Sequence, residues 1–419
     1  MSVTNLVQEI NQTFSNGNND QKFRVFSKVL SVDPSENEYT ISIYNSVSGL
    51  SQVSSNIKTA YDDDWLALNA VVSSFVRICV EMDPWSVLKS FDLYATYLND
   101  LSVAFNNNAY GWLLSGVIKS TIRLVLPWAL KLDRQMFYKE EGGKYRLGYM
   151  AGVLLKIFNN IRINDSSTYK KSIILYLGNK LCYTYWKLDN PLLCQNIFSN
   201  MNNTSLKLEE FPHGEKLKYR YFLAKYYFVK YELVECFKHL EWCLVNTSSK
   251  KNQKLIIELL LPIGLILGKK PNFKTLSVVQ DEEVLTLLEL YESMFYSVAS
   301  GDYESFRNII NHKEQYFKDK NLLLLLNRMD VLVFRNLVKN VWRIMNRPTS
   351  LSLEIVPIHG KDTLFKENLL VTLIDSNLIK GKLTTGKVLV LSKNDPFPNV
   401  FNIYTKRFGA QQQQGKDWM

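Results

Sequence analysis

Histidines, cysteines and clustered carboxylates are the residues that could bind a metal ion or activate a nucleophile in this sequence. Cys236, His239 and Cys243 fall on one predicted helix, but their aliphatic and aromatic neighbours favour packing in a core. Three consecutive aspartates at residues 62–64 precede another predicted helix, where capping explains them better than metal ligation. The four histidines lie far apart in the sequence, and no set of cysteines or carboxylates stands near them at the spacing of a metal site. They are His213, His239, His312 and His359.

Phosphate-binding and nucleophile motifs give no site either. Gly143 and Gly148 have the spacing of a phosphate-binding loop, but Tyr149 and Met150 stand where Lys and Ser or Thr are required. The Gly-x-Ser-x-Gly and dinucleotide-binding patterns are absent from the sequence. We therefore predict no catalytic residue, no metal site and no cofactor, and we expect that the protein is not an enzyme.

Basic residues are more informative, and one group of them lies near the C-terminus. The chain has a formal charge of +10 and a pI near 9.1, which favours an anionic partner. Lysines bind phosphates through counterion release without reading bases, so we expect weak, salt-sensitive, sequence-tolerant binding of RNA or DNA. A solvated surface explains the same residues about as well. The predicted contacts are Arg343, Arg347, Lys361, Lys366, Lys380, Lys382, Lys387 and Lys393.

A second basic group is interleaved with aromatic residues between Glu215 and Lys274. Basic residues outnumber acids there, and the aromatic rings offer contacts to an extended peptide with acidic and aromatic side chains. The alternative is an ordinary solvated face of a helical repeat. The predicted contacts of such an acidic partner are Lys216, Lys218, Arg220, Tyr221, Lys225, Tyr226, Lys230 and Trp242.

The elements that must position the C-terminal basic residues follow the order of a winged helix. Apolar residues recur at helical spacing over residues 322–342, which predicts one long helix. Its polar face carries Arg335, Lys339 and Arg343, and Pro348 follows its end because proline cannot continue a helix.

A second helix and a β-hairpin are predicted after this first helix. A short extended piece at residues 350–353 precedes the second helix, which spans 362–376. Strands at 379–383 and 387–391 follow, and Gly386 supplies the turn. Apolar residues of this region either pair with the winged helix of a partner or fill the core of the domain itself, and they are Leu378, Ile379, Val388 and Val390.

Upstream of the winged helix, the sequence repeats the order helix, tight turn, helix. Three such pairs lie at residues 177–201, 222–244 and 294–317, with aromatic residues along each first helix. Paired helices that cannot bury their faces alone must stack on neighbours, which predicts a tetratricopeptide-like α-solenoid. The predicted fold is mainly α: a solenoid of stacked helix pairs followed by a C-terminal winged helix. The predicted regions are 1–61, polar and partly helical; 62–321, the solenoid; 322–400, the winged helix; and 401–419, a polar tail.

Nothing in the sequence predicts secretion or membrane insertion. Residues 1–19 lack a secretory signal, and the most apolar run, at 255–268, falls short of the ~20 residues that a membrane span needs. The five cysteines show no framework spacing, so we expect them to be reduced and mostly buried in an intracellular protein.

A helical array that runs into a C-terminal winged helix resembles the PCI domain. Within that group, the chain resembles the family that contains the PCI subunit of the nuclear transcription-coupled mRNA export complex and its signalosome-associated paralogue. The resemblance covers about residues 62–393. It rests on six motifs in chain order: MDPWS at 82–86, ILYLGNKL at 174–181, PLLCQNIF at 191–198, YRYFLAKYY at 219–227, LPIGLILGK at 261–269 and FRNLVKNV at 334–341.

The resemblance implies a non-catalytic scaffold subunit that couples transcription to mRNA export at nuclear pores. It implies a winged helix paired with that of a larger PCI scaffold of the Sac type, and a helical repeat gripped by a small acidic disordered subunit of the Sem/DSS type. The paired winged helices would offer a basic surface to RNA or DNA without base specificity. A nuclear protein at the nuclear periphery, without membrane insertion, is thus expected. The alternative is a PCI scaffold of the COP-nine signalosome or the proteasome lid.

Overall fold

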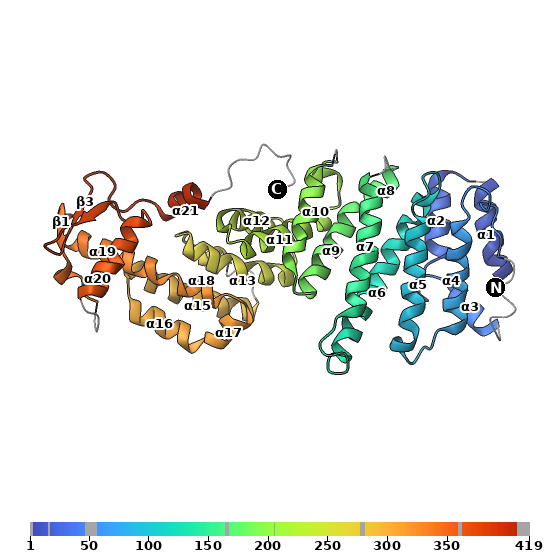
Figure 1. Cartoon of the computed structure of the whole chain (residues 1–419), viewed down its shortest axis with the longest axis horizontal. Coiled ribbons are helices and arrows are strands. Elements are labelled where there is room, and N and C mark those ends of the chain that lie inside the picture. Colours follow the sequence, from blue (N-terminus) through green and yellow to red (C-terminus); the bar gives the residue numbers. More distant parts are fainter. Residues whose placement is uncertain are drawn as a thin grey trace. The chain divides into compact units, whose positions relative to one another are not determined.

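The computed structural model describes residues 3–15, 17–46, 57–163, 167–204, 206–276, 281–358 and 363–408 (Figure 1). Two compact units divide the chain, the first over residues 1–222 and the second over 223–414. Almost all regular structure is helical in both, and the three short strands lie near the C-terminus. The prediction of a mainly α fold, with stacked helix pairs before a winged helix, is confirmed.

The first unit is built from helices that pack on their neighbours in the chain, so that α4, α5, α6 and α7 form successive layers (Figure 1). Its elements are α1 (Val3–Ser15), α2 (Asn19–Val29), α3 (Glu38–Ser46), α4 (Ala67–Glu81), α5 (Val87–Ala104), η2 (Gly111–Leu114), α6 (Ser115–Gln135), α7 (Tyr145–Ile163), α8 (Thr168–Ser172), α9 (Ile174–Lys187), η3 (Pro191–Leu193), α10 (Cys194–Asn202) and η4 (Leu208–Glu210). Helix α11 (His213–Val229) contains the boundary between the units.

The N-terminal helices belong to the core of the first unit. Phe26 is fully buried, and the buried ring of Tyr61 lies 5.9 Å from it in a T-shaped contact. Tyr61 also lies 6.0 Å from Trp65 and 5.1 Å from Tyr110, so one aromatic cluster joins α2 to the segments around α4 and η2. Such T-shaped pairs add stability beyond their buried area.

Helix α6, together with η2 before it, contains a long apolar stretch. Residues 111–135 form the one segment, among the described residues, that is long and apolar enough to cross a membrane by length and composition. Of its apolar window, 56% is buried, and α6 packs against α5 and α7. Core helices of this kind meet the same length and composition, so the segment is explained by packing within the unit.

The first helix of each predicted pair ends in the same C-terminal cap, at a residue with positive φ. Asp189, Tyr231 and Gly301 have φ of 58°, 62° and 81°, in the left-handed region. The next residue in each case donates its N–H to a carbonyl five residues back, at 2.9 Å, as in a Schellman cap. The three tight turns therefore reverse the chain in the same way, which confirms the helix-turn-helix repeat.

The second unit begins with further helix layers and ends with the winged helix. Its elements are α12 (Leu233–Val245), α13 (Lys250–Ile266), α14 (Phe273–Leu276), α15 (Glu282–Ser300), α16 (Tyr303–His312), α17 (Glu314–Asp319), α18 (Leu323–Asn327), α19 (Asp330–Ile344), β1 (Ser350–Ser352), η6 (Leu353–Ile355), α20 (Thr363–Asp375), β2 (Gly381–Leu383), β3 (Val388–Leu391) and α21 (Val400–Phe408).

The predicted single helix over residues 322–342 is wrong in one respect, because the structure divides it into α18 and α19. Helix α18 packs on α13 and α17 and so belongs to the solenoid, whereas α19 contacts α15, α16 and α20. Between them, the guanidinium of Arg328 lies 4.5 Å from the ring of Tyr231, in a cation–π contact that anchors the break. The apolar periodicity runs through both helices and does not show this change of direction.

The winged helix contains a three-stranded antiparallel sheet in the order β1-β3-β2. The outward-facing row pairs Ser350 of β1 with Val390 of β3, and Val390 with Lys382 of β2. Gly386 was expected to permit the hairpin turn, but the left-handed position belongs to Lys387, with φ of 57°. Residues 359–362, which include the predicted start of the second helix, lie outside the described residues.

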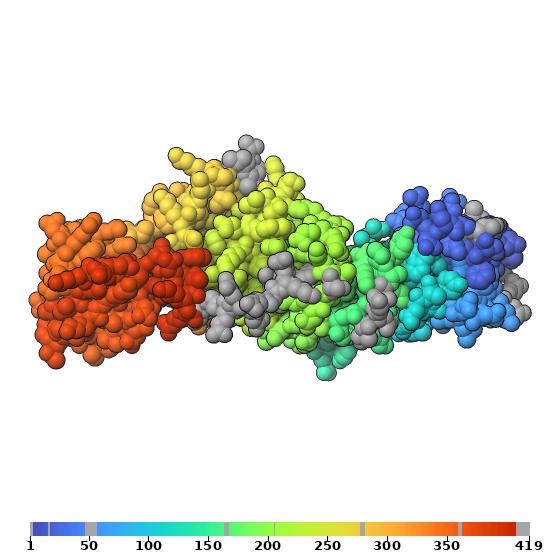
Figure 2. Space-filling view, turned by 90° about the horizontal axis from the view of Figure 1, so that it is seen from above, coloured from blue at the N-terminus to red at the C-terminus, as the bar shows by residue number. Residues whose placement is uncertain are grey.

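The chain after the sheet returns to the solenoid helices. Residues 395–400, here called the C-terminal strap, lead into α21, which packs on α12 (Figures 1 and 2). Val400 reaches the backbone of Gly268, and the ring of Phe401 lies 3.9 Å from the ammonium of Lys269. The expectation of a polar tail over 401–419 is thus corrected for residues 401–408, and 409–419 lie outside the described residues.

Candidate nucleic-acid and partner interfaces

The lysines of the β-hairpin are exposed, as nucleic-acid contacts would require. Lys382 lies on the outward row of β2, and Lys387 projects from the turn between β2 and β3. Neither has an ion pair or a side-chain hydrogen bond among the described residues. The hairpin therefore presents two free ammonium groups, that of Lys382 on a paired strand and that of Lys387 at the turn, which suit contacts to phosphates.

Two further predicted lysines flank the hairpin. Lys380 precedes β2, is exposed, and its Nζ lies 3.7 Å from a carboxylate oxygen of Asp395. Lys393 follows β3 and is exposed. The Lys380 N–H also donates to the Pro396 carbonyl at 2.8 Å, so the start of the hairpin is hydrogen-bonded to the C-terminal strap.

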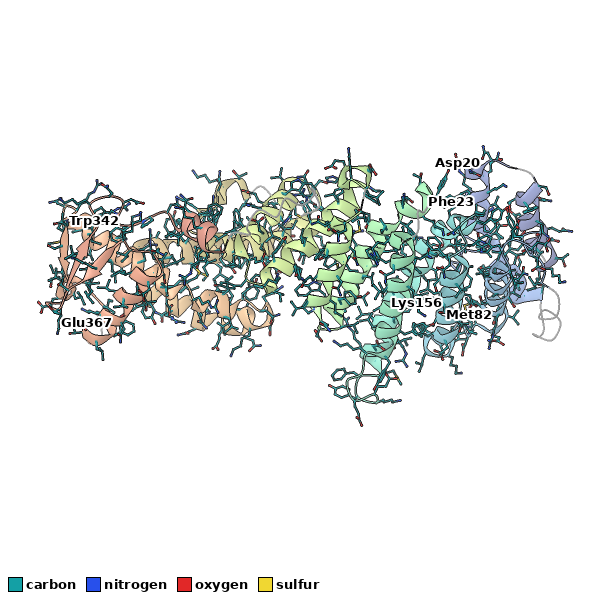
Figure 3. All side chains as sticks on the ribbon, turned by 45° about the horizontal axis from the view of Figure 1, so that its top comes forward. Asp20, Phe23, Met82, Lys156, Trp342 and Glu367 are labelled. Carbon is teal, nitrogen blue, oxygen red and sulfur yellow. The ribbon has the colours of Figure 1, made fainter. Side chains whose placement is uncertain are left out.

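Arg343 and Arg347 lie at the end of α19. Arg343 is exposed in the last turn of the helix, and Arg347 is exposed with φ of 57°. The guanidinium of Arg347 lies 5.9 Å from the ring of Trp342, whose indole N–H donates to the Pro348 carbonyl at 3.0 Å (Figure 3 labels Trp342). Both cations are accessible, and the stacking contact holds the second one near the start of β1.

Lys366 is less accessible than the hairpin lysines. It lies on α20, is half-buried, and its ammonium donates to the Val356 carbonyl at 2.8 Å. That carbonyl follows η6, so the lysine joins the end of η6 to α20. Lys361 lies outside the described residues.

The four apolar residues expected at a partner interface divide into two pairs. Leu378 and Ile379 are 6% and 1% exposed, so they belong to the interior of the winged helix. Val388 and Val390 are half-buried on the outward face of β3. For the first pair, the interpretation as core of the domain holds, and only the two valines stay candidates for an interface.

The role of Arg335 in this domain was not predicted from the sequence. It was expected on the polar face of the helix, but it is 4% exposed. Its guanidinium donates to the carbonyls of Leu378 at 3.1 Å and Pro398 at 2.6 Å, and to the side-chain oxygen of Asn336 at 2.9 Å. Burial lowers the pKa of Arg335 to about 10. Arg335 thus ties α19 to the start of the hairpin and to the C-terminal strap.

The predicted acidic-partner residues lie on α11 and α12. In the first half of α11, Lys216, Arg220 and Tyr221 are half-buried, and the exposed Lys218 lies 3.0 Å from Glu215. These side chains follow successive positions of one helix, so they point in several directions around it.

The second half of α11 differs in the role of its tyrosine. Tyr226 is 4% exposed and so belongs to the core of the repeat. The exposed Lys230 lies 5.5 Å from its ring and 3.0 Å from Glu232, whereas Lys225 and Trp242 are half-buried. The lysines stay candidates for an acidic partner, while Tyr226 has no free face to offer in this conformation.

The residues with metal-ligand chemistry are dispersed or buried. Cys236, His239 and Cys243 are all buried on α12, and the imidazole of His239 stacks on the ring of Tyr227 at 5.7 Å. Burial raises the pKa of the Cys236 thiol. Within the described part of the chain, no group of three histidines, cysteines or carboxylates could hold a metal ion. These side chains act in packing.

The chain is similar to proteins from several eukaryotes over most of its length. It is 27% identical over 355 residues to the nuclear mRNA export protein THP1 of Saccharomyces cerevisiae, covering 74% of this chain and 77% of that protein. It is 23% identical over 420 residues to a PCI domain-containing protein of Schizosaccharomyces pombe, covering 92% of each. It is 26% identical over 314 residues to PCI domain-containing protein 2 of Danio rerio, covering 67% and 74%. No protein-family model matches the chain.

Proposed function

We propose that this chain, a PCI-domain protein of the family that contains nuclear mRNA export protein THP1 and PCI domain-containing protein 2, serves as a scaffold subunit in nuclear mRNA export. The observation that carries this proposal is the similarity to the export protein over three quarters of both chains. The free ammonium groups of the β-hairpin support it, because they suit a surface for RNA backbone.

The proposed nucleic-acid surface consists of the accessible cations of the winged helix. Lys382 and Lys387 on the hairpin carry it, with Lys380, Lys393, Arg343 and Arg347 at its margins. Within the described part of α20, the exposed side includes the apolar residues Leu364 and Val371 and so does not suit base reading in a groove. The proposed contact is therefore with phosphates of RNA or DNA, without base specificity.

The proposed protein partners meet other surfaces. A larger PCI scaffold of the Sac type would pair with the outward face of β3, where Val388 and Val390 are half-buried. A small acidic subunit of the Sem/DSS type would contact α11 and α12 through Lys216, Lys218, Arg220, Lys225 and Lys230. The complex is proposed to act in the nucleus, at nuclear pores.

Affinity purification of the full chain from nuclear extract tests this function. A large PCI scaffold and a small acidic protein should copurify, and the complex should bind RNA with an affinity that falls steeply as salt rises. Copurification of signalosome or proteasome-lid subunits, together with salt-independent or absent RNA binding, would instead assign the chain to a scaffold for protein turnover and end the export proposal.

A further inference from the structure

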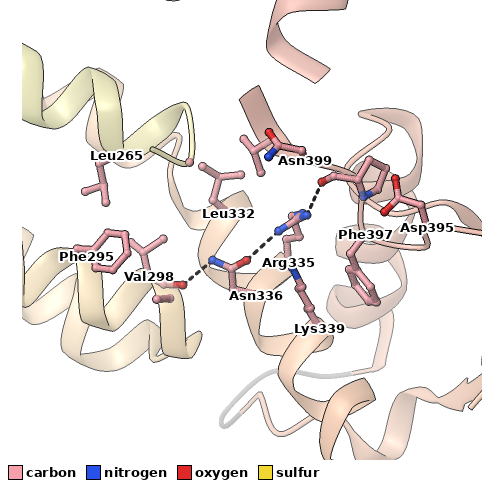
Figure 4. Close-up of a pocket in the computed structure, with 14 residues that line it drawn as sticks. Leu265, Phe295, Val298, Leu332, Arg335, Asn336, Lys339, Asp395, Phe397 and Asn399 are labelled. Carbon is pink, nitrogen blue, oxygen red and sulfur yellow. Dashed lines mark hydrogen bonds between the residues drawn. The ribbon is translucent and has the colours of Figure 1, made fainter. Parts of the chain in front are cut away.

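A cavity of about 470 Å³ lies in the second unit, apart from the hairpin lysines (Figure 4). One face of α19 lines it together with the ends of α13 and α15, and the C-terminal strap closes the opposite side. Its volume falls within the range of roughly 300–1,000 Å³ that small-molecule sites occupy. Here it is called the α19 cavity.

Two cations of α19, one turn apart, line the cavity. Three N–H groups of Arg335 donate to the acceptors described above, and the other two have no acceptor among the described residues. Lys339 is half-buried, and no ion pair neutralises it within the described ranges. Burial, together with Arg335 and Arg343 nearby, lowers the pKa of Lys339. Asp395 offsets this shift only in part. Partly desolvated positive charge that is incompletely balanced is costly in a folded chain, so the two cations favour a bound anion.

Asp395 is the one carboxylate among the residues that line the cavity. Its side chain is 62% exposed, and it lies 3.7 Å from Lys380, which is not a lining residue. The two cations therefore outweigh it inside the cavity. Asp395 also has φ of 47°, a conformation that asparagine adopts as readily, so its charge can be removed without disturbing the strap.

The wall opposite the cations is apolar. Figure 4 shows Leu265 and Phe295 at one end of the lining and Asp395 at the other, with the α19 residues between them. Ammonium and guanidinium groups one turn apart can share a tetrahedral oxyanion, and an aromatic ring accepts a flat apolar group. The cavity thus combines an anion site with a place for an aromatic body.

We propose that the α19 cavity binds a nucleotide unit, with its phosphate against Lys339 and Arg335 and its base against the wall formed by Leu265 and Phe295. The unit belongs either to a free nucleotide or to one residue of a bound RNA strand. The site stands independently of the export proposal, since its test uses the purified chain without extract or partners.

Calorimetric titration of the full chain with adenosine monophosphate tests the site. Saturable binding is expected, and Lys339→Gln should weaken it by about tenfold, the effect of one charge-assisted contact. Asp395→Asn should tighten it by about threefold, because it removes the carboxylate that repels phosphate. Lys406→Gln, on the exposed side of α21, is the matched control and should leave the affinity unchanged.

Three outcomes would overturn the proposal, and competition with RNA identifies the ligand. Absence of saturable binding to the unchanged chain, or binding that neither Lys339→Gln nor Asp395→Asn alters, overturns it. Equal binding of adenosine without phosphate also overturns it, because the cations would then have no role. Competition by an oligouridine RNA places the nucleotide in a bound strand, whereas binding that such an RNA does not displace identifies a free nucleotide as the ligand. Thermal unfolding of each variant confirms that it is folded.

Discussion

The β-hairpin of the winged helix and the adjacent helix α19 use cationic side chains in opposite ways. On the hairpin, Lys382 and Lys387 are exposed and have no partner among the described residues. On α19, Arg335 is almost wholly buried, and two of its three hydrogen bonds join segments 43 and 63 residues further along the chain. The hairpin cations are free to meet an external anion, whereas Arg335 uses three of its five N–H groups within the fold and leaves two toward the α19 cavity. Accessibility and bonding, more than charge, separate binding residues from structural ones in this domain.

The largest expected effect comes from substitution of the buried cation, Arg335. Arg335→Leu should lower the free energy of unfolding by about 2–4 kcal/mol, because it leaves two buried carbonyl groups without donors. Chemical denaturation of the full chain measures this loss, and limited proteolysis should show earlier cleavage after the strap. Arg343→Leu, on the same helix but exposed, should change stability by less than about 0.5 kcal/mol. Equal losses in the two variants would contradict the assignment of Arg335 as a structural cation.

A second buried cation, in the first unit, extends the comparison to pH. The ammonium of Lys170 donates to the carbonyls of Phe105 at 2.5 Å and Asn107 at 2.9 Å, and burial lowers its pKa from 10.5 to about 8. Between these values the unfolded chain binds more protons than the folded chain, so this contribution to stability rises with pH. It is fully present above 10.5 and lost as pH falls through about 8.

The variant Lys170→Met should remove this rise. Denaturation of both chains at a series of pH values between 7.5 and about 10.5 gives the difference in slope, with Lys28→Met on the exposed face of α2 as the control. An unchanged slope in Lys170→Met would mean that another group titrates in this window.

On the binding side, Lys382→Gln together with Lys387→Asn should weaken RNA binding by about tenfold without loss of stability. The slope of log affinity against log salt should fall by about 1.4, since each phosphate contact on a single strand contributes about 0.7. Fluorescence anisotropy with labelled RNA measures both quantities. Lys366→Gln is the informative control, because its amine already binds the Val356 carbonyl, and RNA affinity should stay as it is. A loss equal to that of the hairpin variant would restore Lys366 as a contact.

The smallest expected effect concerns Lys387, whose backbone conformation affects stability and whose side chain is proposed to bind RNA. Lys387 occupies the left-handed region, which costs a non-glycine residue about 1 kcal/mol. Lys387→Gly should therefore raise the free energy of unfolding by up to about 1 kcal/mol while it weakens RNA binding. Thermal unfolding and anisotropy on the same sample test both directions. A drop in stability would show that the lysine side chain has a structural role.

The order of elements in the winged helix was predictable because it depends on local signals. Helical periodicity, Pro348 and the alternating run before Leu391 each act within a few residues. The burial of Arg335 was not predictable in this way, because its acceptors at Leu378 and Pro398 are brought near only by the tertiary fold. The break between α18 and α19 has the same origin, since the two helices pack on different neighbours.

The candidate binding residues were predictable where their exposure depends on local sequence, and not where it depends on contacts between distant elements. Exposure of Lys382 follows from alternation along paired strands, and Lys387 is exposed at the turn, both of which depend on local sequence. The use of Lys366 by the Val356 carbonyl and the burial of Tyr226 depend on contacts between elements that periodicity does not specify. The cation pair of the α19 cavity could have been noticed, because Arg335 and Lys339 stand four residues apart on one helix.

The return of the C-terminal strap to α19 bears on the order in which the chain can fold during synthesis. Domains generally fold as they emerge from the ribosome, N-terminal parts first. The Pro398 carbonyl that receives Arg335 is synthesised 63 residues after Arg335 itself. Helix α19 therefore emerges from the ribosome before the strap can cover it, and Arg335 with the apolar residues around it stays exposed during that interval. Chaperones that bind exposed apolar segments thus have a defined period of synthesis in which to act on this part of the chain.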